Sequence, residues 1–402
     1  MSNHLKLANR LAQVKPSVTM AVTAKAAELR ASGRDIISFG AGEPDFATPD
    51  YIVESVRQAL ADPNTFKYTN VRGRTDLREA IAAELNKVHG KALTTANIVV
   101  SCGAKHSLYN ICMALFEAGD EVIIPAPYWV SYPAMVRLTD ATPVILQSSP
   151  DDGYMIDPDA LSAAITKRTR AIILNNPSNP TGAVYSSERL AAITKICADN
   201  NIFVISDDIY RSLVYAGSEY HSIAQVCPEL GQRAIFVDGV SKSYAMTGWR
   251  IGFVAAAEPI ASAIAKIQSQ STSNAPHISQ LAALAALTHD GRDQALASMH
   301  AIFDGRRKKM HQLLSDIDGV HCLEPRGAFY AFPDLSAFIG KGKMAMTDVE
   351  LATQLVEDAG VAAVPGSGFG APGNMRLSYA CSDQDIEQGI ARLAATLTTT
   401  RH

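Results

Sequence analysis

The sequence lacks any uninterrupted apolar stretch of about 18 residues, the length that a membrane-spanning helix needs. Its first residues are polar and have no apolar centre of the kind found in secretion signals. A strong charge of one sign is also missing, because 36 lysines and arginines face 40 aspartates and glutamates, and the net charge of -4 gives no basic surface for nucleic acid or an anionic membrane. We therefore expect a cytoplasmic protein whose partners are small molecules, with no nucleic acid and no membrane among them.

Cysteine is scarce and scattered. The six cysteines form no close pair at the spacing of metal ligands, and a chain of this length does not depend on a disulfide framework. We expect reduced, mostly buried thiols and no metal site. The cysteines are Cys102, Cys112, Cys197, Cys227, Cys322 and Cys381.

Length and pattern indicate a two-domain α/β protein. At 402 residues the chain exceeds the size at which a single core stops growing. Short apolar runs alternate with helical patterns through the first two thirds of the chain, which predicts a mostly parallel sheet covered by helices on both faces. The predicted strands are 98–101, 121–124, 142–146, 171–174, 202–205 and 234–237.

The character of the chain changes after a long helical region that begins near residue 258 and resumes after Gly291. Shorter strands at 327–332, 361–366 and 375–379, with a helix at 348–359, predict a smaller α+β unit. We expect residues 1–47 to pack with this unit, residues 48–290 to form the large domain and residues 291–402 to form the small one.

Residues 241–250 contain the densest cluster of chemically useful side chains. A lysine that reacts with a carbonyl must lose its proton, and a neighbouring cation helps it do so, which makes Arg250 a candidate neighbour for Lys242. The Ser241 hydroxyl and the Arg250 guanidinium suit a phosphate group. A lysine beside a phosphate site suggests pyridoxal phosphate, although Lys242 as a surface lysine and Arg250 in an ion pair remain the alternative.

A second phosphate signal lies far away in the chain. The predicted strand 98–101 leads through Gly103, Ala104 and Lys105 into a helical pattern. The free amides and the dipole at a helix start attract anions, so this turn is a candidate phosphate site.

Polar clusters follow three other predicted strands, where ligands bind in parallel sheets. They contain Trp129, Asn179, and Asp207 with Tyr210. Each has a structural alternative: Trp129 in the core, Asn179 in a turn and Asp207 as a helix cap. Together they suit pyridoxal phosphate. An aromatic face can stack on its ring, an amide and a phenol can bond its ring hydroxyl, and a carboxylate can keep its ring nitrogen protonated.

As an ordered set, the motifs resemble the pyridoxal-phosphate aminotransferases of fold type I, and most closely the bacterial aspartate and prephenate aminotransferase subgroup. The resemblance covers nearly the whole chain. It is carried by residues 15–17, 41–46, 67–68, 103–105, 127–132, 179–182, 206–210, 241–242, 248–252 and 376–379.

The resemblance implies a role for each matching residue. Lys242 would link to pyridoxal 5'-phosphate and move the substrate proton, Asp207 would pair with the ring nitrogen, and Tyr210 would contact the ring hydroxyl with Asn179. The other implied cofactor contacts are Gly103, Ala104, Lys105, Trp129, Ser241, Arg250 and, from a second subunit, Tyr68. Because that site is shared, the resemblance also implies a homodimer.

The implied substrates are amino acids and 2-oxo acids. Their α-carboxylate would meet Arg376 and Gly42, beside Trp129 and Asn179, since a guanidinium binds a carboxylate through two bonds. In this subgroup the Lys105 position is associated with the distal carboxylate of aspartate or glutamate, and the Lys15 position with prephenate. Both lysines favour dicarboxylic substrates.

One stretch departs from the subgroup, because Arg72 and Arg74 flank Gly73 where small residues are expected. They are either surface charges or, if they face the site, determinants of a bulkier or more anionic substrate.

The predicted activity is transamination between aspartate or glutamate and 2-oxoglutarate or oxaloacetate in two half-reactions, with prephenate as a further substrate. An aromatic or broad-range aminotransferase, and a carbon-sulfur lyase on the same scaffold, are alternatives. A catalytically idle binding module is a third, but the complete reactive set speaks against it.

Overall fold

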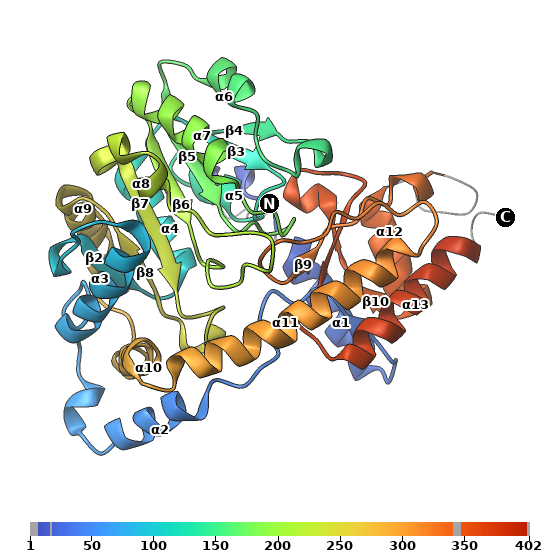
Figure 1. Cartoon of the computed structure of the whole chain (residues 1–402), viewed down its shortest axis with the longest axis horizontal. Coiled ribbons are helices and arrows are strands. Elements are labelled where there is room, and N and C mark those ends of the chain that lie inside the picture. The colour runs from blue at the N-terminus through green and yellow to red at the C-terminus, as the bar shows by residue number, and fades with distance from the viewer. Residues whose placement is uncertain (1–6, 17, 341–346, 400–402) are drawn as a thin grey trace, which may run out of the picture.

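The computed structural model describes residues 7–16, 18–340 and 347–399, and Ser17 of the 15–17 motif lies outside them. Figure 1 shows a larger body on the left, a smaller one on the right, and α11 (Arg292–Ser315) running from one to the other. Within the described ranges, no helix combines the length and apolar character that crossing a membrane requires.

The larger body is built on a seven-stranded sheet with the order β2-β8-β7-β6-β5-β3-β4. Its strands are β2 (Ile98–Ser101), β3 (Glu121–Ala126), β4 (Thr142–Gln147), β5 (Thr169–Asn175), β6 (Phe203–Asp207), β7 (Ala234–Gly239) and β8 (Gly252–Ala255). All neighbours pair in parallel except β8, which is antiparallel to both β7 and β2. The predicted mostly parallel sheet is confirmed, and β8 is a strand that the sequence patterns did not indicate.

Helices cover both faces of this sheet. Successive side chains of a strand point to opposite faces, and in β5 Ile172 belongs to one buried cluster while Ile173 belongs to another. Each face is therefore sealed by its own helical layer (Figure 1). The helices are α2 (Asp50–Ala59), α3 (Thr75–His89), α4 (Ala104–Leu115), α5 (Tyr132–Arg137), α6 (Pro158–Ala164), α7 (Ser187–Asp199), α8 (Ile223–Val226), α9 (Glu258–Ser269) and α10 (His277–Thr288).

The antiparallel β8 determines where residues 241–250 lie. Since β7 and β8 are antiparallel neighbours, with Gly239 opposite Gly252, the segment that joins them leaves and re-enters the sheet at one edge. Ser101, at the end of β2, also pairs with Gly252. This geometry brings the 241–250 segment beside the turn that begins α4.

The smaller body combines segments from both ends of the chain. Strand β1 (Ile37–Ser38) pairs with β10 (Val361–Ala362), and Figure 1 shows the blue α1 among orange and red elements. The predicted boundaries at residues 47 and 290 stay a prediction. The other elements are α1 (Val18–Ala31), β9 (Tyr330–Ala331), α12 (Asp348–Gln354) with its π-helical extension Leu355–Ala359, β11 (Val364–Pro365), β12 (Met375–Ser378) and α13 (Asp383–Thr399).

Some predicted elements are shorter than the sequence suggested. The strand expected at 361–366 is divided at Ala363 into β10 and β11, which belong to different sheets. The helical region expected from residue 258 breaks between α9 and α10, where Ser273 has a left-handed φ of 62° and Pro276 directly precedes α10. Apolar content identified these regions but did not locate the breaks.

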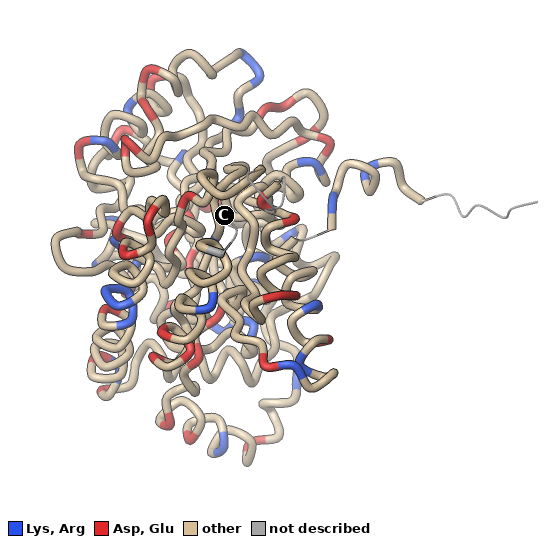
Figure 2. Tube along the Cα trace, turned by 90° about the vertical axis from the view of Figure 1, so that its right-hand side faces the viewer, with Lys and Arg blue, Asp and Glu red and all other residues tan. Residues whose placement is uncertain are grey.

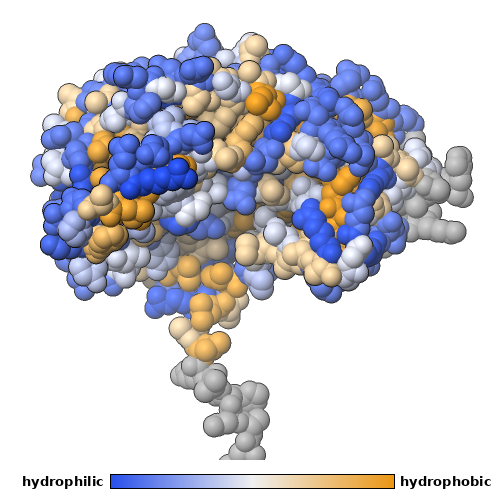
Figure 3. All heavy atoms as spheres, turned by 90° about the horizontal axis from the view of Figure 1, so that it is seen from below, coloured by the Kyte–Doolittle hydropathy of each residue, from blue (hydrophilic) through white to orange (hydrophobic). Residues whose placement is uncertain are grey.

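Over the described residues, the surface has no large region of one charge sign or of purely apolar side chains on the faces that Figures 2 and 3 show. Figure 2 shows basic and acidic residues interspersed along the trace. On the face shown in Figure 3, hydrophobic side chains are interrupted by hydrophilic ones over most of the body. Large apolar side chains that are strongly exposed include Leu7, Phe66 and Tyr68.

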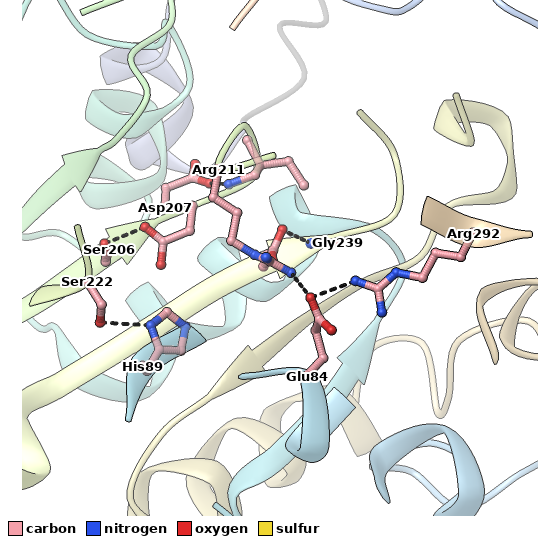
Figure 4. Close-up of polar contacts among 11 residues, drawn as sticks. Glu84, His89, Ser206, Asp207, Arg211, Ser222, Gly239 and Arg292 are labelled. Carbon is pink, nitrogen blue, oxygen red and sulfur yellow. Dashed lines mark hydrogen bonds and ion pairs between the residues drawn. The ribbon is translucent and has the colours of Figure 1, made fainter. Parts of the chain in front are cut away.

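A buried charge network ties the large body to α11. The Glu84 carboxylate of α3 accepts hydrogen bonds from Arg211 at 3.1 Å and Arg292 at 2.9 Å, and Figure 4 shows Glu84 between the two guanidinium groups. Arg211 also donates to Asp238 on β7 at 2.6 Å. Because Arg211 directly follows Tyr210, the network anchors the loop after β6 as well as the first turn of α11.

Replacing Glu84 with Gln should destabilise the protein. The change keeps the shape but removes the charge of a buried carboxylate between two partly buried guanidinium groups. Breaking a fully buried ion pair from one side costs about 3–5 kcal/mol, so we expect a loss of about 2–3 kcal/mol for this partly buried network. Asp199→Asn is the control, since it breaks the exposed Lys195–Asp199 pair, which is worth about 1 kcal/mol or less. Urea unfolding at pH 7 measures both, and equal losses would contradict a stabilising role for the network.

The loss from Glu84→Gln should also depend on pH. Burial alone would raise the pKa of Glu84, but the hydrogen bonds and charges of Arg292 and Arg211 lower it overall. A depressed folded-state pKa stabilises the fold above the unfolded value, about 4.3 for Glu, and this contribution disappears as the pH falls. The difference between wild type and variant should therefore be full near neutral pH and shrink in acid.

Candidate active site

A cavity of about 440 Å³ opens at the edge of the large sheet and reaches the smaller body. The carboxyl ends of the parallel strands meet at this edge, which is where open α/β sheets bind ligands. The structure brings most of the predicted site residues to its walls. They are Gly42, Ala104, Lys105, Trp129, Asn179, Asp207, Tyr210, Ser241, Lys242, Arg250 and Arg376.

Three predicted residues do not line the cavity. Tyr68 is 89% exposed, and Lys15 is exposed ahead of α1. Gly103 directly precedes Ala104, the first residue of α4, and Ala104 rather than Gly103 lines the cavity. Within one chain, Tyr68 and Lys15 are thus separate from the other predicted residues.

Lys242 lies in the turn after β7, and its Nζ donates a hydrogen bond to the backbone oxygen of Gly42 at 2.6 Å. Burial lowers the pKa of Lys242 to about 8, with further lowering by the charges of Arg376 and Arg250, while Glu43 and Asp207 oppose the shift. We expected Arg250 as the activating neighbour, but burial is the larger cause. With a pKa of about 8, about one Lys242 side chain in ten is uncharged at pH 7, far more than for an ordinary lysine.

Asp207 ends β6 and is buried. Its Oδ2 accepts a hydrogen bond of 2.6 Å from the hydroxyl of Tyr132. Burial raises the pKa of Asp207 to about 6, although Tyr132, the Ile209 amide and the charge of Lys242 act in the opposite direction. No helix starts at Asp207, so the alternative of a helix cap is wrong. The carboxylate is suited to hold a proton or a positively charged ring nitrogen.

Arg376 is a buried cation on β12. One Nη donates to Asn179 Oδ1 and the other to the backbone oxygen of Gly40, each at 3.0 Å. Among the described residues no carboxylate forms an ion pair with it, and its Nε has no hydrogen-bond partner. Since an unpaired buried charge is costly, the cavity presents a site for an anion.

The start of α4 is a second candidate anion site. The first amides of a helix have no partner inside the helix and can bind an anion. The amide of Gly103, directly before α4, is not available, because it donates a hydrogen bond to the Ser101 oxygen at 2.8 Å. A Cβ on Gly103 would lie 2.6 Å from Nη2 of Arg250, and one on Gly252 would lie 2.1 Å from the Ala104 amide nitrogen. Only glycine at these two positions lets the Arg250 guanidinium and strand β8 lie so close to the start of α4. Arg250 and Ala104 both line the cavity, so this part of its wall suits a phosphate group.

The two unexpected arginines bind groups of their own chain. Arg72 donates to the Ala96 oxygen and to Ser262 Oγ, each at 2.7 Å. Arg74 pairs with Asp76 and contacts His277. Neither lines the cavity in one chain, so the structure gives no basis for a direct contact of Arg72 or Arg74 with a ligand there.

Sequence reasoning gave no role to two tyrosines of the cavity wall. Tyr132 contacts Asp207, and Tyr330 contacts both Tyr210 and Arg376. Tyr132 lies in the 127–132 motif and Tyr330 in a strand-like run, so each was visible in the sequence. Their partners come from distant segments, which no local pattern identifies.

The low pKa of Lys242 predicts selective labelling. At pH 7.5 a lysine with a pKa of about 8 is uncharged in roughly a quarter of molecules, against about one in a thousand for an ordinary lysine. In protein free of small molecules, acetic anhydride should label Lys242 with half-maximal rate near pH 8, read by peptide mass spectrometry. Exposed Lys195, whose pKa Asp199 raises, is the internal control. A profile for Lys242 that matches Lys195 would contradict the perturbed amine.

The comparisons with known proteins agree with this geometry. Residues 34–393 match the family described as aminotransferase class I and II. An aspartate aminotransferase of Streptomyces avermitilis is 43% identical over 98% of this chain and 96% of its own length. An aspartate/prephenate aminotransferase of Cereibacter sphaeroides is 45% identical over 97% of this chain and 98% of its own.

Solved structures show the same fold. The aspartate aminotransferase of Thermus thermophilus with maleate superimposes with a TM-score of 0.92 at 39% identity, covering 98% of this chain and all of that one. That of Rhizobium meliloti gives 0.93 at 37% identity over 98% and 99%. The chain has the fold-type-I architecture and belongs to the class I and II aminotransferase family.

Proposed function

We propose that this aminotransferase uses pyridoxal 5'-phosphate bound to Lys242 and exchanges amino groups between aspartate or glutamate and the 2-oxo acids oxaloacetate and 2-oxoglutarate, with prephenate as a further substrate. The observation that carries the proposal is one cavity with a low-pKa lysine, a buried carboxylate and a buried arginine without a counter-ion. The names of the relatives support the choice of aspartate.

The residues present fit the cofactor. Ser241, Arg250 and the first amides of α4, at Ala104 and Lys105, would hold its phosphate, where Gly103 and Gly252 let the guanidinium and the helix start lie close together. Toward the ring, Asp207 would face the nitrogen, Trp129 would stack on the plane, and Asn179 and Tyr210 would bond the ring hydroxyl. When bound, pyridoxal phosphate supplies an aldehyde that reacts with amines and a protonated ring that withdraws electrons.

The chain itself supplies binding and proton transfer. Arg376 would bind the substrate α-carboxylate through paired hydrogen bonds near Gly42, exchanging its present contact with Asn179. Uncharged Lys242 Nζ, in the same cavity, would carry a proton to and from the α-carbon of the bound substrate. The smaller body would complete the wall of the cavity and exclude water.

A second cation supports dicarboxylic substrates. Lys105 lines the cavity with its Nζ 4.7 Å from the centre of the Trp129 ring. Burial and the charge of Arg250 lower the pKa of Lys105. A distal carboxylate near Lys105 would compensate this charge, while Lys15, outside the cavity, would act on prephenate only if the N-terminal segment moves toward the site.

We also propose a homodimer with shared sites. Tyr68 is 89% exposed and Phe66 69% exposed, on a segment that contacts solvent in one chain. Covering such aromatic side chains is favourable. In the dimer, Tyr68 would reach the phosphate site of the second subunit.

The visible absorbance of the lysine-bound cofactor tests the function directly. Adding aspartate should shift the band to shorter wavelength as the cofactor takes the amino group, and oxaloacetate should restore it. Lys242→Ala should bind cofactor without turnover. Silence toward every dicarboxylic amino acid would reject the substrate, and release of pyruvate and ammonia from a cysteine conjugate would indicate the lyase instead.

Two cation variants should separate the carboxylate sites. Arg376→Lys keeps a charge but not the planar fork, so kcat/KM should fall at least about thirtyfold, equivalent to about 2 kcal/mol, for every amino acid. Lys105→Met should lower kcat/KM about tenfold for aspartate and leave alanine unchanged. Exposed Lys266→Met is the matched control. A loss for alanine equal to that for aspartate in Lys105→Met would contradict a distal-carboxylate role.

A further inference from the structure

Tyr330 forms a direct link, at the wall of the cavity, between the three-stranded sheet of the smaller body and the loop that follows β6 of the large sheet. It lies on β9 of the smaller body, while Tyr210 follows β6 of the large sheet. Their hydroxyl oxygens are 2.9 Å apart, and both side chains are buried. A buried hydroxyl pair of this kind is held by its partners rather than by water.

The ring of Tyr330 also contacts Arg376. The antiparallel register places Ser378 opposite Tyr330, and Arg376 lies two residues along the same face of β12, within reach as a diagonal neighbour. The guanidinium carbon of Arg376 is 4.5 Å from the centre of the Tyr330 ring and 5.1 Å from that of Phe369. The cation is thus in contact with two aromatic rings.

We propose that Tyr330 is a positioning residue that connects the substrate-carboxylate arginine to the tyrosine at the cofactor ring. Its ring fixes the guanidinium of Arg376, and its hydroxyl orients the hydroxyl of Tyr210. This role rests on the proposed function, because it assigns Arg376 to the substrate and Tyr210 to the cofactor.

The direction of the hydrogen bond follows from the surroundings. The positive charge of Arg376 favours Tyr330 as the donor to Tyr210, and it also opposes the effect of burial on the pKa of Tyr330. When Tyr210 accepts this bond, its own proton is free to point at the cofactor ring hydroxyl. A chain of two hydroxyls donating in one direction also strengthens each bond.

The hydroxyl role is tested with Tyr330→Phe, which keeps the ring and removes only the hydroxyl. In the holoenzyme, the absorbance of the lysine-bound cofactor changes with pH as the chromophore loses a proton. A weaker bond from Tyr210 makes the ring oxygen more basic, so the protonated chromophore should persist to higher pH. We expect the midpoint to rise by about 0.2 to 0.5 unit, a fraction of the effect of one whole neutral hydrogen bond, because the Tyr210 bond is weakened and not lost.

Tyr379→Phe is the matched control. Tyr379 is also buried in the smaller body, but its hydroxyl donates to the backbone oxygen of Ala328. It should leave the midpoint within about 0.1 unit of wild type, well under the effect of a hydrogen bond at the ring. Equal shifts in the two variants would mean that Tyr330 acts only through general packing, and no shift in Tyr330→Phe would overturn its hydroxyl role.

The ring role is tested with maleate, a dicarboxylate that has no amino group to react. Tyr330→Phe should keep its dissociation constant from the holoenzyme within about twofold, whereas Tyr330→Leu, which loses the cation–π contact, should raise it about tenfold. Unchanged affinity in a folded Tyr330→Leu would overturn the ring role. If the wild-type protein binds no cofactor or shows no such titration, the proposed function fails, whereas a normal wild type with unaffected variants rejects only the role of Tyr330.

Discussion

In the proposed function, the chemistry depends on a Lys242 amine that loses its proton more readily than an ordinary lysine, in a cavity where Arg376 and Arg250 stay charged. Burial lowers the pKa of the amine to about 8 and raises that of the Asp207 carboxyl to about 6. Both shifts have the same cause, removal from water, which disfavours whichever form is charged. The cavity wall therefore brings together two perturbed groups. The Lys242 amine is partly uncharged at neutral pH, and the Asp207 carboxyl is mostly ionised there but takes up a proton more readily than an ordinary aspartate. A bound cation at Asp207 or a bound anion at Arg376 would relieve part of the cost.

The sheet topology makes this arrangement possible. Parallel strands deliver Asp207 and the segment after Asn175 to one edge, and the antiparallel β8 returns the 241–250 segment to that edge. If β8 ran parallel to β7, the chain would enter β8 at the opposite end of the sheet, and Arg250 would lie far from Lys242. The close contact of Gly252 with the first amide of α4 then fixes the distance between the arginine and the helix start. One strand direction and two glycines thus position the whole anion site.

The sequence predicts the chemical part of this arrangement better than its geometry. Lys242, Asp207 and Arg376 could be predicted as site residues because their residue types and neighbouring motifs resemble a known family, and the structure places all three at one cavity. The parallel strands could be predicted because buried strands are continuous apolar runs. Strand β8 was missed, since Gly252–Ala255 is short and begins with glycine. Tyr132 and Tyr330 had no assigned role because their partners lie 75 and 120 residues away in the chain. Such contacts are set by tertiary structure, and local patterns carry no information about them.

Several contacts across the cavity join the two bodies, and most of them involve groups that bind ligand in the proposed function. Arg376 reaches Asn179, Tyr330 reaches Tyr210, and Lys242 reaches Gly42. A substrate carboxylate at Arg376 would replace one of these contacts with a stronger, charge-assisted one. Ligand binding and the association of the two bodies are therefore linked through the same side chains, and a ligand can shift that association only if it binds one arrangement of the two bodies more tightly than another. Further from the cavity, Arg306 of α11 pairs with Asp45 at 2.7 Å and the Glu84 network holds the first turn of α11. Because these ion pairs lie outside the cavity, they can keep the helix in place while the contacts within it are exchanged.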